Sequence, residues 1–169
     1  MKQDQGSKRV YHRPMALADL EQVMAIERAS FPTPWPVQAF IKEIHRKRNS
    51  ICWVAEMDGP EIDPMVVGSI VIWLIHQKGH IGTLSIHPGC RRQGIAQYLL
   101  AHSLLECLKR GIHSVDLEVR EGNQIAQSLY QKFGFVITGQ RDGYYEDTNE
   151  DAYIMTLSPL TKDKLAELA

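Results

Sequence analysis

The chain has 169 residues, with 19 basic and 20 acidic side chains, a formal net charge of −1 and a hydrophobic fraction of 44%. That length fits one domain, residues 1–169, and the composition is typical of a soluble globular protein rather than a disordered or collagen-like one. A near-neutral chain has no overall electrostatic attraction for nucleic acid, so we expect no direct nucleic-acid partner, although local basic clusters remain open.

The N-terminal part of the chain predicts a tail and two helices. Residues 1–10 are polar and lack the apolar core of a signal peptide, so we expect a flexible tail. Apolar residues at helical spacing predict a helix over residues 17–30. The proline-rich run Phe31–Pro36 ends this helix, and Pro36 suits the first turn of a second helix over residues 36–48.

Three β-type segments follow. Residues 51–56 and 66–74 are separated by the turn-forming stretch Asp58–Pro64, which predicts a hairpin with a long loop. Gly79 opens the next strand, which continues to Ile86.

The second half of the chain alternates helices and strands. An apolar stripe predicts a helix from about Gly94 to Arg110, with Gly111 as its C-cap. The remaining expected elements are a strand at 114–119, a helix at 123–133, strands at 135–140 and 152–157, and a C-terminal extension at 159–169. The central β-α-β order requires a parallel pair and the flanking hairpins require antiparallel ones, so we predict an α/β fold with a mixed central sheet and helices on both faces.

Three cysteines, Cys52, Cys90 and Cys107, are an odd number at wide spacing. We therefore expect neither a disulfide framework nor a metal site, and we read Cys52 and Cys107 as small buried apolar residues in a reducing, cytoplasmic compartment. No run of about 18 apolar residues occurs, which predicts no transmembrane helix and no membrane partner.

A candidate phosphate loop follows the strand that ends at Ile86. The hexapeptide Arg91-Arg92-Gln93-Gly94-Ile95-Ala96 opens a helix, where small residues and free N–H groups suit a pyrophosphate and two arginines add positive charge. It lacks the GK[ST] ending of nucleotide-phosphate enzymes and the dinucleotide G-x-G-x-x-G pattern. Taken alone, it could equally be a helix N-terminus with two solvated arginines.

Three further residues are candidates for chemistry. Glu118 lies near the carboxyl end of an apolar strand, where a carboxylate is costly unless it faces a cleft or is bonded. Tyr130 lies seven residues after Asn123, on the same helix face. Taken alone, a tyrosine such as Tyr130 is more often a core aromatic residue, Asn123 an N-cap, and His80 a strand histidine with its hydrogen bonds satisfied.

These stretches resemble a known family. Arg91-x-x-Gly94-x-Ala96 resembles the [RQ]-x-x-G-x-[GA] motif of the GNAT acetyltransferases, and residues 117–135 are similar to the "LEVR-x-x-N-x-x-A-x-x-LY-x-x-x-GF" stretch of RimI-type protein N-terminal acetyltransferases. Glu150–Met155 resembles their "EDAxxM" strand, and the similarity covers residues 10–158. The resemblance implies the GNAT fold and acetyl-CoA as co-substrate.

The resemblance also assigns the cofactor-binding residues. In that family the strand before the motif hydrogen-bonds the pantetheine arm through its backbone, the motif binds the pyrophosphate, and the helix of Asn123 and Tyr130 contacts the arm. The implied set is Leu84, Ser85, Ile86, Arg91, Arg92, Gln93, Gly94, Ile95, Ala96, Asn123 and Tyr130.

The resemblance implies Glu118 as general base and Tyr130 as the acid that protonates the departing thiolate. An α-amino group has a pKa of about 7.7–8.0 against about 10.4 for lysine, so a carboxylate with a raised pKa is able to deprotonate it, directly or through water. His80, in the dipeptide Gly79-His80, is a further candidate because a similar histidine shares the base role in some relatives.

On the substrate side, the resemblance assigns Phe31, Trp35, Tyr144 and Tyr145 to peptide binding. It implies acetylation of a protein N-terminus, a ribosomal protein being one candidate, by a monomer or weak dimer. Two alternatives stay open: the same fold acting on a lysine side chain or a small amine, and a catalytically silent acyl-CoA-binding module. The long loop at Asp58–Pro64 departs from the family pattern and leaves the substrate undecided.

Overall fold

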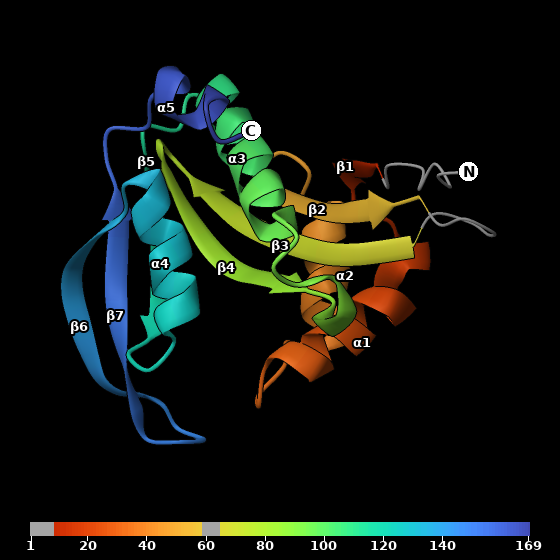
Figure 1. Ribbon diagram of the computed structural model, residues 1–169, viewed down its shortest axis with the longest axis horizontal. Coiled ribbons are helices and arrows are strands. Elements are labelled where there is room, and N and C mark those ends of the chain that lie inside the picture. The colour runs from red at the N-terminus through yellow and green to blue at the C-terminus, as the bar shows by residue number, and fades with distance from the viewer. Residues whose placement is uncertain (1–8, 59–64) are drawn as a thin grey trace, which may run out of the picture.

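A computed structural model describes residues 9–58 and 65–169 (Figure 1). The strands form one seven-stranded sheet in the order β1-β2-β3-β4-β5-β7-β6. The elements are β1 (Val10–Pro14), α1 (Leu20–Ser30), α2 (Val37–His45), β2 (Ser50–Met57), β3 (Met65–Ile75), β4 (Lys78–Ile86), α3 (Ile95–Lys109), β5 (Ser114–Arg120), α4 (Gln124–Phe133), β6 (Val136–Tyr145), β7 (Glu150–Leu157) and α5 (Lys162–Ala166). The predicted mixed α/β fold is confirmed.

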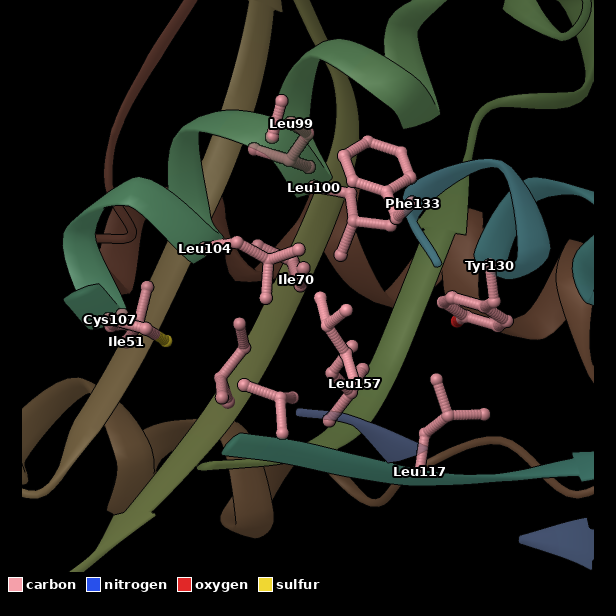
Figure 2. Packing of buried hydrophobic residues seen from close by; sticks show 14 of the residues in the cluster. Ile51, Ile70, Leu99, Leu100, Leu104, Cys107, Leu117, Tyr130, Phe133 and Leu157 are labelled. Atoms are coloured by element: carbon pink, nitrogen blue, oxygen red, sulfur yellow. The ribbon is translucent and has the colours of Figure 1, made fainter. Parts of the chain in front are cut away.

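Helices cover both faces of the sheet (Figure 1). Neighbouring strand residues point to opposite faces, so Ile51 packs in the core under α3 and α4, and Cys52 packs in the core under α1 and α2. Figure 2 shows the larger core, in which side chains of α3 meet those of the sheet and Tyr130 lies close to Leu117.

The feature that creates the site is the separation of β4 from β5. In these parallel strands, only Lys78–Ile81 of β4 pairs with β5, and its partners are Ser114–Leu117. A bulge starts the separation: Ile72 pairs with Ile81 and Val71 with Thr83, which leaves Gly82 as the extra residue. Within the described residues, the backbone groups of 82–86 that face β5 therefore have no partner strand, and the carbonyl of Ile86 bonds the Arg91 side chain instead.

The N-terminal prediction is partly wrong. Val10 was placed in a flexible tail, but it begins β1. This strand pairs antiparallel with β2, with Val10 opposite Met57 and Pro14 opposite Trp53. Residues 1–8 of the predicted tail lie outside the described residues, as do Gly59–Pro64 of the predicted hairpin loop. The antiparallel pairing of β2 with β3 on either side of that loop is confirmed.

The first two helices differ in detail from their predicted bounds. The segment predicted from residue 17 begins as a 3₁₀ turn at Leu17–Asp19 before α1 starts. The second helix ends at His45 rather than at 48, because the Arg46 N–H bonds the carbonyl of Glu43, three residues back, and the chain turns there. Pro36 is the residue before this helix and not part of its first turn.

Residues 159–169 form part of the core. Leu160 and Leu165 are only 4% and 1% exposed, and α5 packs against α3. The Gln97 side chain donates a 3.1 Å hydrogen bond to the Leu168 carbonyl. The segment predicted as an extension therefore completes the α3 face of the sheet.

The three cysteines are free and buried. Burial raises the pKa of both Cys52 and Cys107 to about 12, so these thiols stay protonated and act as apolar side chains, as predicted. In residues 9–58 and 65–169, no helix is both long and apolar enough to cross a membrane.

Candidate active site

A cleft with a volume of about 840 Å³ opens where β4 and β5 separate. This volume lies within the range of about 300–1,000 Å³ that is usual for small-molecule sites. It is lined by the separated strands, by α4 and the loop before it, by the end of α1 and the loop between α1 and α2, and by the β6–β7 hairpin. Of the predicted site residues, Phe31, Trp35, Leu84, Glu118, Asn123, Tyr130, Tyr144 and Tyr145 line this cleft.

Glu118 enters the cleft from the α1 side of the sheet. Its Oε2 lies 2.8 Å from Nε2 of His80, and its Oε1 lies 3.6 Å from Nη2 of Arg141. The hydrogen bond from His80 is the largest influence and lowers the pKa of Glu118; the nearby charges of His80 and Arg141 act the same way, against the effect of burial. The expectation of a raised pKa is therefore wrong. Glu118 is ionised at neutral pH and able to accept a proton.

Tyr130 reaches the same cleft from the α3 side. Its ring packs edge-to-face against Phe135 at 5.5 Å, and the residue is 7% exposed. Among the residues that the structure describes, none hydrogen-bonds its hydroxyl. Burial, and to a smaller extent Tyr145, raises the pKa of Tyr130, so it holds its proton at neutral pH. A proton acceptor and a proton donor thus meet in the gap between β4 and β5.

The predicted phosphate loop lies between the end of β4 and α3. Gly94 caps α3 with a left-handed φ of +79°, and a Cβ built there would have no atom within 4 Å. The loop backbone is thus open to a ligand at the start of α3, whose first N–H groups have no partner within the helix. Ile95 is buried beneath this turn and Ala96 packs beside it.

Several predicted cofactor residues are held by the protein itself. Arg91 donates to the Ile86 carbonyl and to Ser30 Oγ, both at 3.1 Å, so it ties the loop to β4 and α1, while Arg92 is exposed. Ser85 and Ile86 have buried side chains, and neither residue lines the cleft. Gln93 bonds the Gly89 carbonyl at 3.3 Å.

The glycine at position 94 offers a test of this loop. Gly94→Ala should raise the Kd for acetyl-CoA by about 10-fold or more, because the new Cβ occupies the space where the backbone must approach the phosphates. Gly111 is a matched control, since its φ is +77° and its Cβ would also be in open space. The free energy of unfolding should fall by about 1–2 kcal/mol in both variants, which is the cost of placing a residue other than glycine in the left-handed backbone conformation.

Isothermal titration calorimetry of acetyl-CoA checks this prediction. An equal change in Kd for Gly94→Ala and Gly111→Ala would mean that backbone strain alone acts, and the phosphate-loop assignment would fail.

Asn123 caps α4, as its Oδ1 accepts a 3.1 Å hydrogen bond from the Ala126 N–H. The N-cap interpretation of Asn123 is therefore correct, and the same residue lines the cleft. Its contact with a cofactor arm stays a prediction.

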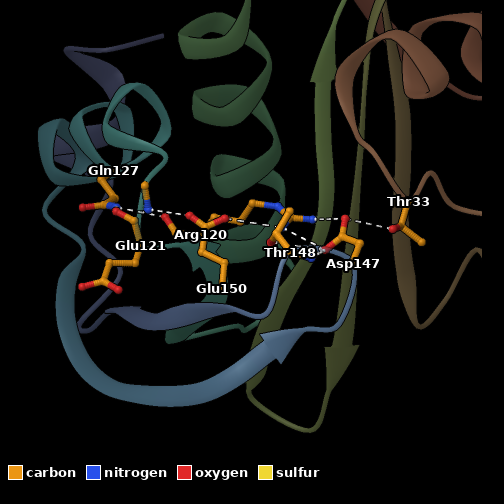
Figure 3. Close-up of polar contacts among 8 residues, drawn as sticks. Thr33, Arg120, Glu121, Gln127, Asp147, Thr148 and Glu150 are labelled. Atoms are coloured by element: carbon orange, nitrogen blue, oxygen red, sulfur yellow. Dashed lines mark hydrogen bonds and ion pairs between the residues drawn. The ribbon is translucent and has the colours of Figure 1, made fainter.

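Sequence reasoning missed Arg120, which organises the outer wall of the cleft (Figure 3). Arg120 bonds both Asp147 carboxylate oxygens at 3.1 and 2.8 Å, and its guanidinium lies 3.9 Å above the centre of the Tyr145 ring. Thr33 Oγ1 donates to the same Asp147 at 3.1 Å. These contacts join β5, the β6–β7 hairpin and the α1–α2 loop into one wall.

Glu27 was also missed, and it supports the loop between α1 and α2. It is completely buried on α1 and accepts hydrogen bonds from the Trp35 N–H at 3.4 Å and from Thr83 Oγ1 at 3.3 Å. Burial raises its pKa. Its signal in the sequence is its spacing, because Glu27 lies four residues after the buried Val23 and so falls on the apolar face of the helix.

The comparisons with known proteins agree with this geometry. Residues 20–135 match the model of the Acetyltransferase (GNAT) family. The chain belongs to the GNAT acetyltransferase family. As a GNAT acetyltransferase it is an acyltransferase that uses acetyl-CoA as co-substrate. The cleft has the volume of a small-molecule site, and the loop at Gly94, which does not line the cleft, leaves its backbone open to a ligand.

Relatives of this GNAT chain include two kinds of named enzyme. It is 41% identical over 141 residues to the [ribosomal protein bS18]-alanine N-acetyltransferase of Escherichia coli, covering 82% of this chain and 90% of that one. It is 32% identical over 157 residues to an N-alpha-acetyltransferase of Sulfurisphaera tokodaii, covering 85% and 89%. The crystal structure of Ard1 from Thermoplasma volcanium superposes with a TM-score of 0.78 at 28% identity, covering 90% and 99%.

Proposed function

We propose that this acetyltransferase transfers the acetyl group of acetyl-CoA to the N-terminal α-amine of a protein, with Glu118 as general base and Tyr130 as general acid. The observation that carries the proposal is the meeting of an ionised carboxylate and a protonated phenol in one cleft, one from each face of the sheet. These are the two protonation states that acyl transfer from a thioester to an amine requires.

The proposed roles follow from where each proton must go during the reaction. Acetyl-CoA supplies an acetyl thioester, and the amine must lose a proton as it attacks the carbonyl carbon. Glu118 accepts that proton, while the hydrogen bond from His80 keeps its carboxylate ionised and oriented. Tyr130 donates its proton to the sulfur as the carbon–sulfur bond breaks. An α-amine, with a pKa of about 7.7–8.0, is partly neutral at pH 7, which makes it an easier substrate than a lysine side chain.

A protein N-terminus suits the walls of the cleft. The α1–α2 loop supplies Phe31 and Trp35, and the hairpin opposite supplies Tyr144 and Tyr145, so a peptide entering between them would meet aromatic side chains on both sides. The names of the relatives support an N-terminal α-amine, and the E. coli relative makes the N-terminus of a ribosomal protein the first candidate substrate.

One observation favours a second candidate, a lysine side chain or a small amine. Glu146, Asp147 and Glu150 all line the cleft, and an acidic lining attracts any cation. Arg120 offsets part of this charge, because it pairs with both Asp147 and Glu150. The substrate class therefore needs a direct test.

The test is acetylation of a peptide panel with acetyl-CoA. Half of the peptides would have free N-termini with different first residues, and the other half would have blocked N-termini and a free lysine; thiol release and peptide mass would be read together. Acetylation restricted to free N-termini supports the proposal. Modification of the blocked peptides, or of polyamines added separately, would establish the second candidate, and no turnover on any amine would contradict both.

A further inference from the structure

Three aromatic rings form a row that ends on Glu118. Trp35 and Trp73 stack with ring centres 5.3 Å apart and an angle of 16°, and Trp73 and His80 stack at 5.6 Å and 15°. His80 then contacts Glu118 at 2.8 Å. The row therefore connects the loop between α1 and α2 (residues 31–36, the proposed substrate-side loop) to the carboxylate of the proposed base.

The sheet explains why these side chains share one face. Trp73 lies directly opposite His80 in the antiparallel pair of β3 and β4, and directly paired residues of a sheet point to the same side. His80 lies opposite Asp116 in the parallel pair of β4 and β5. Glu118, two residues beyond Asp116, points to that same face and lies diagonally across from His80.

The bulge at Gly82 makes room for the outer end of the row. A Cβ at this position would lie 2.7 Å from the Trp35 ring and 3.1 Å from the Trp73 ring. Only a residue without a side chain lets the two indoles stack against the strand. The same glycine thus opens the cleft and admits the row.

His80 needs such a support. The torsion that turns an imidazole ring is broad, so the ring adopts a single plane only when its neighbours impose one. Trp73 covers one face of the ring and runs nearly parallel to it. Trp35 in turn lies against Trp73 and is fixed through its backbone by the buried Glu27.

We propose that Trp73 is a positioning residue for the proposed acetyl transfer: its indole holds the His80 ring in the plane that directs Nε2 at Glu118, and it links that pair to the substrate-side loop through Trp35. Trp73 does not itself line the cleft and therefore acts through His80. The inference rests on the proposed function for its kinetic consequence, but the positioning itself is measurable without turnover.

The chain contains a matched control for this tryptophan. Trp53 is also partly buried, and it also stacks on a histidine, His12, with ring centres 4.9 Å apart and an angle of 23°. It lies on β2 and lines no part of the cleft. A loss of stability from removing an indole should be similar in the two variants Trp73→Leu and Trp53→Leu, whereas an effect on Glu118 should occur only in the first.

The first measurement follows the Glu118 carboxyl carbon by ¹³C NMR as pH is varied, with Glu118→Gln used to assign the resonance. In the wild type the titration midpoint should lie below the ordinary value for glutamate, because His80 donates to the carboxylate. Trp73→Leu should move the midpoint up, Trp73→Phe should keep it near the wild-type value, and Trp53→Leu should leave it unchanged. An unmoved midpoint in a folded Trp73→Leu protein would overturn the proposal.

The second measurement is kinetic. With a peptide that the wild type acetylates, Trp73→Leu should lower kcat/KM by about 10–10²-fold, the scale of a small misplacement of a catalytic group. In a His80→Gln background the same change should have little further effect, since the partner through which Trp73 acts is gone. Additive losses would contradict the proposal. If no amine is acetylated at all, the proposed function fails, while the NMR titration still decides the role of Trp73.

Discussion

Glu118→Gln is expected to lower kcat by about 10²–10⁴-fold, with the Kd for acetyl-CoA unchanged. The amide has the size of the carboxylate, and its oxygen still accepts the hydrogen bond from His80, so the cleft keeps its shape while it loses the group that takes the proton. Stopped-flow detection of thiol release measures the rate, and calorimetry measures the affinity.

Asp116→Asn is the matched control for Glu118→Gln. Asp116 lies on the same face of β5, two residues earlier, but it bonds Thr156 Oγ1 at 2.7 Å and does not line the cleft. Both variants remove one negative charge from that face. Similar losses in the two variants would attribute the effect to charge alone, and unchanged turnover in Glu118→Gln would exclude this residue as the base.

The second large effect is expected for Tyr130→Phe, which should lower kcat by about 10²-fold or more with little change in the free energy of unfolding. The edge-to-face packing on Phe135 does not need the hydroxyl, and within the described residues that hydroxyl has no hydrogen-bond partner to lose. The defect should shrink with an acetyl donor whose thiol is more acidic, because such a thiolate leaves without a proton.

Tyr153→Phe is the control for Tyr130→Phe. Its hydroxyl bonds Glu121 at 2.9 Å outside the cleft, so its removal tests the loss of a phenol oxygen as such. A rate for Tyr130→Phe within twofold of the wild type would leave the departing thiolate without an assigned proton donor and would disprove the role proposed for this residue.

Much of the fold could be predicted because its signals are local. The prolines at 32–36 separate the first two helices, and Gly111 and Gly134, with φ of +77° and +96°, end α3 and α4 where the sequence placed these ends. Strand β1 escaped prediction because its five residues, Val10–Pro14, are stabilised by pairing with β2 some 40 residues later rather than by a pattern of their own.

Part of the lining of the cleft could be predicted from the sequence, but its electrostatics could not, and His80 and the residues of the predicted phosphate loop do not line the cleft. The motifs placed Glu118 and Tyr130 in one site, and the structure brings both to the cleft. The direction in which the pKa of Glu118 shifts depends on its contact with His80. That contact arises from the register of β4 against β5, and the distance between the two residues in the sequence does not reveal it. Arg91 shows the same limit, because its contact with Ser30 depends on how α1 packs beside the loop.

The strand order has a consequence for how the protein is made. Strand β7 lies between β5 and β6, so β6 finds its neighbour in the sheet only after Glu150–Leu157 has been synthesised, and Leu165 seals the core later still. The half of the molecule that contains the predicted phosphate loop emerges first, at about 5–20 residues per second, and the wall that carries Tyr144 and Tyr145 is completed last. A nascent chain therefore presents Phe31 and Trp35 and the predicted phosphate loop before the opposite, tyrosine-bearing wall of the cleft exists, and the complete cleft forms only after β7 has been added to the sheet.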